Sequence, residues 1–154
     1  KRWPSKAWHP ARVKEFIKVL NEKGYEILLF SGPDEKKEEV EKLIYELRKN
    51  NIIIYQNNPS NTIKQFASLV NICRIIVCSD SLALHVSLAL KKPAIALFFC
   101  TSPNEVEDYG ILKKISSPLL YDFFPEKQDQ YSEKLVNSIS VAEVVKVVEE
   151  INKK

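Results

Sequence analysis

The segment at positions 79–85 places polar side chains where a strand is predicted to turn into a helix. Asp80 and Ser81 follow an apolar, strand-like run at 74–78, and His85 lies in the helix-like stretch after them. A helix N-terminus offers an anion unpaired N–H groups and a partial positive charge. Asp80 is a typical N-cap residue, and Ser81 adds a hydroxyl. The segment therefore predicts an anion site where a strand turns into a helix.

A purely structural role for the same residues stays open. Asp80 can serve only as an N-cap, and His85 can be a hydrogen-bonded histidine of the core. Because the two residues are five positions apart, they cannot both point inward from a helix that starts at Ser81. The local pattern alone leaves both interpretations in place.

The other potential metal ligands and nucleophiles lack a functional spacing. His9 and His85 are the two histidines of the sequence, and the carboxylates show no ligand spacing. Cys73, Cys78 and Cys100 lack a CxxC motif, and we expect them to be buried free thiols. We expect neither a metal nor another cofactor.

The elements that must position the polar segment follow from hydrophobic periodicity. Apolar residues recur at helical spacing or in short strand-like runs, and residues 109–132 are less regular. The predicted helices cover 10–23, 34–49, 62–70, 81–90 and 141–151, and the predicted strands cover 26–30, 51–55, 74–78 and 93–99. This alternation predicts an α/β fold, a Rossmann-like parallel sheet with helices on both faces. Trp3 and Trp8 are expected to pack on the first helix, with a sugar-stacking platform as the alternative.

Bulk composition narrows the class of protein further. The 154 residues fit one compact domain, and 23 basic against 20 acidic residues give a formal charge of +3. The lysines alternate with glutamates, so we expect no nucleic-acid partner. No apolar run reaches the roughly 18–20 residues of a membrane span. We expect a cytoplasmic protein, with peripheral attachment of the full-length protein to the inner membrane left open. The absence of methionine suggests an excised piece.

Three motifs in order resemble one family. Residues 1–4 read K-x-W-P, residues 80–93 resemble D-S/T-G-x-x-H-x-x-A-A-x-x-x-P, and residues 99–103 resemble G-x-T-x-P. Together they resemble the C-terminal domain of the ADP-heptose:lipopolysaccharide heptosyltransferases, glycosyltransferase family 9. The resemblance implies a GT-B enzyme that transfers heptose from ADP-heptose to the lipopolysaccharide inner core with inversion and without a metal. Residues 1–154 would form its single donor-binding domain, and an N-terminal acceptor domain outside the chain would supply the general base.

The resemblance also implies which residues hold the nucleotide sugar. The corresponding positions are Lys1, Glu35, Asn61, Asp80, Ser81, Leu82, Ala83 and His85. Lys1 would contact the diphosphate, Glu35 the ribose, and Asn61 would lie near the adenine. Residues 80–83 would bind the phosphates through backbone N–H groups, and His85 would support that loop or reach a phosphate. No catalytic residue is expected within this chain.

The sequence also departs from the family pattern. Leu82 and Phe99 stand where the family usually has glycine, and the strand that normally precedes K-x-W-P is missing. Glycine allows the backbone to approach a ligand closely, and the larger side chains of Leu82 and Phe99 restrict that approach. Two alternatives therefore stay open: a GT-B or epimerase-type domain that uses a UDP- or GDP-sugar, and a non-catalytic nucleotide-binding or adaptor module.

Overall fold

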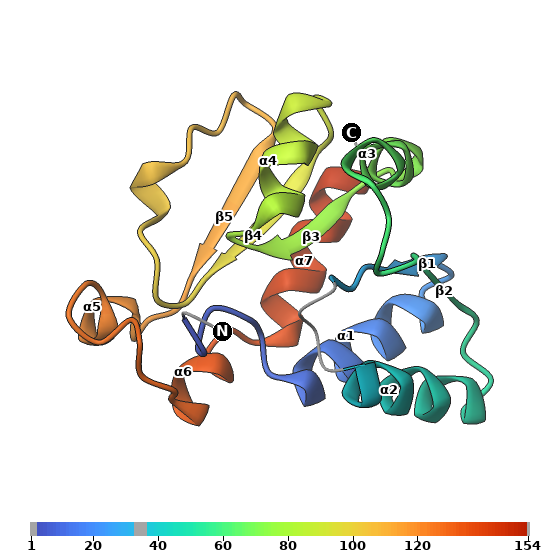
Figure 1. The fold of residues 1–154 in the computed structure, drawn as a ribbon, viewed down its shortest axis with the longest axis horizontal. Coiled ribbons are helices and arrows are strands. Elements are labelled where there is room, and N and C mark those ends of the chain that lie inside the picture. The colour runs from blue at the N-terminus through green and yellow to red at the C-terminus, as the bar shows by residue number, and fades with distance from the viewer. Residues whose placement is uncertain (1–2, 33–36, 154) are drawn as a thin grey trace.

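The protein is described by a computed structural model that covers residues 3–32 and 37–153, in which helices and parallel strands alternate (Figure 1). The helices are α1 (Pro10–Glu22), α2 (Lys37–Lys49), α3 (Ile63–Ile72), α4 (Leu82–Ala89), α5 (Leu120–Phe123), α6 (Glu133–Val136) and α7 (Val141–Asn152), and a short 3-10 helix covers Pro103–Glu105. The strands are β1 (Ile27–Leu29), β2 (Ile54–Gln56), β3 (Ile76–Ser79), β4 (Ala94–Phe98) and β5 (Leu112–Ser116).

Strand pairing confirms the predicted α/β class. Within the described residues, β1 pairs with β2, and β4 lies between β3 and β5, with every pair parallel. Ser79 lies opposite Leu97, and Phe98 lies opposite Ser116, which fixes the register at the carboxyl ends. Parallel neighbours require crossover connections, which α2, α4 and the 99–111 segment provide for the pairs β1-β2, β3-β4 and β4-β5.

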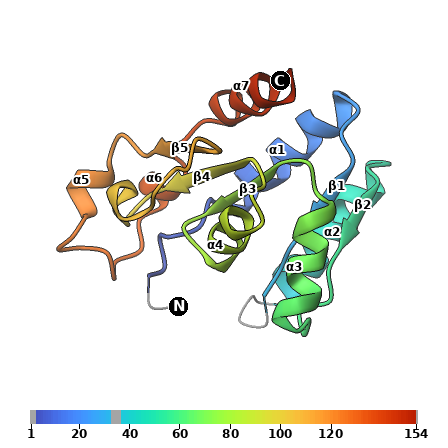
Figure 2. The same cartoon turned by 90° about the horizontal axis from the view of Figure 1, so that it is seen from above.

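The central strand β4 divides the apolar core into two layers. All five of its residues are buried. Ile95 and Leu97 belong to the apolar cluster that contains α1 and α7, whereas Ala96 and Phe98 belong to the cluster that contains α4. Side chains of a strand alternate between its faces, so the two clusters lie on opposite sides of the sheet. Figure 2 shows α7 and α4 on these opposite faces.

The strand β5 was not predicted, because it lies in the segment that we expected to be irregular. Leu112 and Ile115 are buried in this strand, whereas Lys113 and Lys114 are exposed. The two lysines interrupt the apolar run on which strand prediction relies. Lys114 Nζ instead donates to the carbonyl of Pro103 at 2.8 Å, which ties β5 to the preceding loop.

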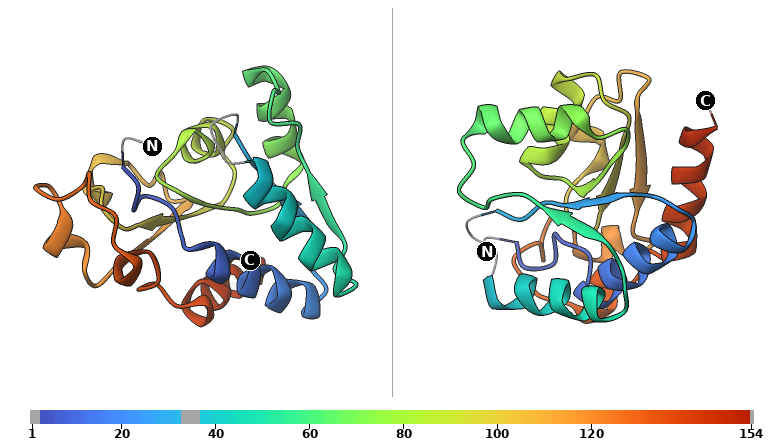
Figure 3. Two further views of the ribbon diagram at one scale, coloured as in Figure 1. Left: turned by 60° about the horizontal axis from the view of Figure 1, so that its bottom comes forward. Right: turned by 90° about the vertical axis from the view of Figure 1, so that its right-hand side faces the viewer.

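The β1-β2 pair is separate from the larger sheet in its backbone hydrogen bonding. Across residues 3–32 and 37–153, no strand pairing joins β1 to β3. Side chains bridge the two parts, since Ile27 of β1 and Val77 of β3 pack on the same apolar cluster. A further cluster, which includes Ile44, Leu47 and Ile54, holds α2 against β2. Figure 3 shows β1 and β2 with α1 and α2 beside them.

Candidate functional site at the start of α4

The N-terminal end of α4 lies where β3 ends, but Asp80 is not its cap. The N-cap residue is Ser81, with extended backbone angles, and its side chain makes no capping hydrogen bond. Our prediction that Asp80 caps this helix is therefore wrong. The reason is that β3 stays paired through Ser79, so both Asp80 and Ser81 are needed for the turn into the helix. The first N–H groups of α4 receive no side-chain cap from Ser81, and such groups lack an intrahelical acceptor.

Asp80 instead forms an ion pair with Lys6 and lies near His85. Its Oδ2 atom lies 3.0 Å from Lys6 Nζ, and its Oδ1 atom lies 3.9 Å from His85 Nε2. The side chain of Asp80 is 19% exposed, whereas that of His85 is 63% exposed. The interpretation of His85 as a core histidine is therefore wrong, because its ring lies at the surface beside the start of α4.

The contact between Lys6 and Asp80 was not foreseen from the sequence. Lys6 lies two residues after the K-x-W-P motif, and nothing in its surroundings marks it as a ligand. Its ammonium lies 4.8 Å from the centre of the Trp3 ring, a cation–π contact. Sequence reasoning missed Lys6 because its partner, Asp80, belongs to an element far along the chain.

Residues 3–9 are held in place by the C-terminal part of the chain. The buried Ser5 hydroxyl donates to the Gln130 carbonyl at 2.9 Å and accepts from the Ser132 N–H at 2.8 Å. Trp8 donates from Nε1 to the Ile139 carbonyl at 3.1 Å and packs against Phe16 of α1, as we predicted for this tryptophan. The N-terminal segment therefore carries Lys6 to the carboxyl end of β3 on a fixed backbone.

The two residues that replace glycine have different environments. Phe99 is 1% exposed and belongs to the apolar cluster that contains α1 and α7. Leu82, in contrast, is 59% exposed at the first position of α4. Phe99 thus serves the core, and Leu82 presents its side chain at the mouth of the candidate anion site. Ala83 follows within α4, and its carbonyl accepts from the Ser87 hydroxyl at 2.6 Å.

Two buried oxygen atoms lack a hydrogen-bond partner within the described residues. They are Asn61 Oδ1 and Thr101 Oγ1. Asn61 precedes α3, close in sequence to Asn57, which links the loops after β1 and β2 through Ser31. Thr101 follows β4 and is 7% exposed. A buried polar atom without a partner is unusual, and both atoms lie in loops that follow the carboxyl ends of strands.

The structure brings some of the predicted residues together and leaves others apart. Asp80, Ser81, Leu82, Ala83 and His85 form one continuous group at the start of α4. Asn61 lies on a different loop, next to α3. Lys1 and Glu35, expected at the diphosphate and the ribose, lie outside the described residues, as do Asp34 and Lys36.

A thiol lies just before this group, at Cys78. Burial raises the pKa of the Cys78 thiol to about 12, against an opposing effect of the hydrogen bond with Ser81. The three cysteines are free thiols. A thiol with so high a pKa remains protonated at neutral pH, so Cys78 is no nucleophile. Across the part of the chain that the structure describes, no group of three or more His, Cys, Asp or Glu side chains could hold a metal ion.

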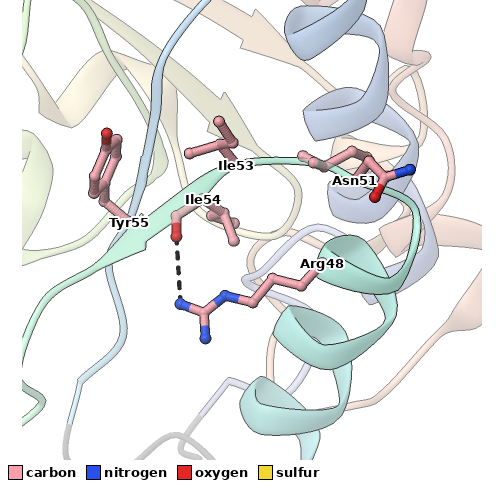
Figure 4. Close-up of a pocket in the computed structure, with 6 residues that line it drawn as sticks. Arg48, Asn51, Ile53, Ile54 and Tyr55 are labelled. Atoms are coloured by element: carbon pink, nitrogen blue, oxygen red, sulfur yellow. Dashed lines mark hydrogen bonds between the residues drawn. The ribbon is translucent and has the colours of Figure 1, made fainter.

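Two surface hollows differ in how they lie relative to the residues at the start of α4: one lies apart from them, and the other includes His85. One lies along β2 and is lined by Arg48, Asn51 and residues 52–55, where Arg48 donates to the Ile54 carbonyl (Figure 4). It contains none of the predicted site residues. The other measures about 800 Å³ and lies between α4 and the 105–111 loop, with His85, Leu88 and Glu105 among its lining residues. His85 therefore lines this second hollow as well as lying near Asp80 at the helix start.

Comparison with known proteins assigns the chain to a family. The sequence model of glycosyltransferase family 9 (heptosyltransferase) matches residues 1–136. The chain belongs to this family. It is 30% identical over 146 residues to lipooligosaccharide heptosyltransferase 2 of Haemophilus ducreyi, covering 89% of this chain and 40% of that protein. It is also 30% identical over 102 residues to lipopolysaccharide heptosyltransferase 2 of Escherichia coli K12, covering 66% of this chain and 29% of that protein.

Solved structures of family 9 members share the fold. A glycosyltransferase family 9 structure from Veillonella parvula superposes with a TM-score of 0.74 at 19% identity, over 98% of this chain and 43% of that one. Escherichia coli heptosyltransferase WaaC with ADP superposes with a TM-score of 0.70 at 18% identity, over 96% of this chain and 40% of that one. The family 9 chain described here thus spans less than half the length of these relatives. None of the helices among its described residues is long and apolar enough to cross a membrane.

Proposed function

We propose that this chain is the donor-binding part of a lipopolysaccharide heptosyltransferase. The observation that carries the proposal is the start of α4, which directly follows the carboxyl end of β3 and has no side-chain cap. In open parallel sheets, ligands bind beyond the carboxyl ends of the strands, and a helix N-terminus binds phosphate. Family membership and the ADP in the solved WaaC structure support a nucleotide-sugar donor.

The proposed reaction is inverting glycosyl transfer from ADP-heptose to the lipopolysaccharide inner core. An acceptor hydroxyl forms a bond to the anomeric carbon of heptose, and the bond from that carbon to the diphosphate oxygen breaks. ADP leaves with the bonding electrons, and the hydroxyl proton passes to a carboxylate base on an acceptor domain outside this chain. The N–H groups of α4 and a lysine would stabilise the charge on the diphosphate without a metal.

Roles for the individual residues belong to the same proposal. Lys1 would contact the diphosphate, Glu35 the ribose, and residues 80–83 the phosphates through their backbone. His85, exposed beside Asp80, can reach an anion from the side of the helix. Asn61 offers a buried amide oxygen without a partner in the part of the chain that the structure describes, and an adenine amino group would supply one. We also place the full-length protein in the cytoplasm, with peripheral attachment to the inner membrane as an alternative.

Nucleotide titration of the chain tests the proposal. We expect ADP to bind more tightly than UDP or GDP, because uracil has no amino group for Asn61 Oδ1 and guanine carries its amino group at a different ring position. We also expect the ADP affinity to change little when magnesium is added, because the charge is offset by N–H groups and lysine. Isothermal titration calorimetry and NMR shift mapping on residues 57–62 and 80–85 measure both.

The possible outcomes separate the three functional classes. Equal affinity for ADP, UDP and GDP would contradict the adenine assignment and favour another nucleotide sugar. No binding of any nucleotide would favour a non-catalytic module. A strong and saturable dependence on magnesium would contradict the metal-independent mechanism.

A further inference from the structure

The acidic residue at the start of α4 poses an electrostatic problem for the proposed anion site. Asp80 lies directly before the N-cap residue, on the turn that would face the diphosphate. A carboxylate in that position repels a diphosphate and offsets the positive end of the helix. The site therefore needs a cation that neutralises Asp80.

Lys6 meets that need, and the structure fixes its position. Its Nζ atom lies 3.0 Å from Asp80 Oδ2 and 4.8 Å from the centre of the Trp3 ring. The Lys6 side chain is 27% exposed, so the ammonium is partly shielded from water yet still reachable. The neighbouring Ser5 is fully buried and hydrogen-bonded to Gln130 and Ser132. Little further ordering of Lys6 is needed before a ligand can bind.

We propose that Lys6 is a ligand of the donor diphosphate, held in place by Asp80 and by the face of Trp3. An ammonium has three N–H donors, and one carboxylate oxygen requires only one of them. The remaining donors can reach phosphate oxygens at the uncapped end of α4. Asp80 then acts as a positioning residue that orients the lysine. This inference rests on the proposed function, because it assumes that a diphosphate binds here.

A buried hydroxyl at the same edge supports the inference. Thr101 Oγ1 is buried and without a partner among the described residues, and it follows Cys100 in the chain. Burial raises the pKa of the Cys100 thiol, while the charges of Lys6 and Asp80 act on it in opposite directions. The end of β4 therefore lies within electrostatic reach of the Lys6–Asp80 pair. A phosphate or sugar oxygen bound there would satisfy the Thr101 hydroxyl.

Titration of Lys6 variants with ADP and with adenosine tests the inference. Adenosine has the same base and ribose but no phosphate, so a diphosphate ligand affects only ADP. We expect Lys6→Gln to weaken ADP binding by about 10- to 100-fold, the usual range for a charge-assisted hydrogen bond. Adenosine binding should stay unchanged, and Lys6→Arg should retain most of the ADP affinity. The matched control is Lys146→Gln on α7, an exposed lysine on the face of the sheet opposite α4, which should change neither affinity.

Each outcome decides between distinct conclusions. If Lys6→Gln binds ADP as tightly as the unaltered chain, Lys6 is not a ligand, although the proposed function stands. If Lys6→Gln weakens ADP and adenosine equally and lowers the melting temperature, its role is structural, and the inference is also overturned. If the unaltered chain binds no ADP, the proposed function fails and the inference fails with it.

Discussion

At the scale of single residues, the site depends on a contact between segments far apart in the sequence. The sequence correctly places Asp80, Ser81 and His85 at a strand-to-helix turn, because polar residues between a buried strand and an amphipathic stretch mark such a turn. It could not show that Asp80 pairs with Lys6. That pair depends on how residues 3–9 pack against Gln130 and Ser132, which no local pattern encodes. The capping role that we predicted for Asp80 failed because β3 stays paired through Ser79, which moves the helix start to Ser81.

The thiol of Cys78 gives a prediction that depends on pH. Its pKa is raised to about 12, mainly by burial, so at pH 8 only about one thiol in 10,000 is a thiolate. We expect iodoacetamide at pH 8 to leave Cys78 unmodified in the folded chain. Labelling should increase as the pH rises toward 12 and in urea, where the burial is lost. Peptide mass spectrometry measures the modification, and labelling of folded Cys78 at pH 8 as fast as in urea would contradict the expectation.

At the scale of elements, the longer helices and the strands β1 to β4 were the predictable part of the fold, whereas the short helices α5 and α6 were not predicted. The periodicity of α1 and the continuous apolar run of β4 come from burial, and burial is visible in the sequence. The strand β5 was missed because Lys113 and Lys114 are exposed in it. Pairing with β4 and burial of Leu112 and Ile115 hold the segment in its extended form. Tertiary contacts thus determine the conformation of β5, whose own sequence has the weakest strand pattern.

The starts of α4 and α7 offer a matched comparison of helix capping. Ser81 makes no capping hydrogen bond, whereas the Ser140 hydroxyl accepts from the Glu143 N–H at 3.2 Å. We expect Ser140→Ala to lower the free energy of unfolding by about 1 kcal/mol, the usual cost of losing a cap, and Ser81→Ala to lower it by less than about 0.5 kcal/mol. Urea denaturation measures both values. An equal loss for the two variants would show that Ser81 does cap its helix in solution.

At the scale of the whole molecule, the division of the strands into two sheets bears on how the chain opens. The β1-β2 pair has its own apolar cluster with α2, and it meets the larger sheet through side chains such as Ile27. Strand amides in β4, with neighbours on both sides, should be the slowest to exchange their hydrogens with solvent. Those of β1 and β2 should exchange faster, as a separate group. Exchange followed by NMR tests this, and equal protection of β2 and β4 would contradict it.

A bound nucleotide would link the β1-β2 pair to the larger sheet, the two regions that we expect to open separately. The proposed adenine contact, Asn61, follows β2, and the proposed phosphate contacts follow β3, so one ADP molecule would touch both regions. Opening of either region would release half of the ligand, so the free energy of binding would add to the cost of each opening. Saturating ADP should slow hydrogen exchange in β1 and β2 as well as in β3. Because the two sheets are not hydrogen-bonded to each other, the bound donor would itself contribute to the stability of the domain that binds it.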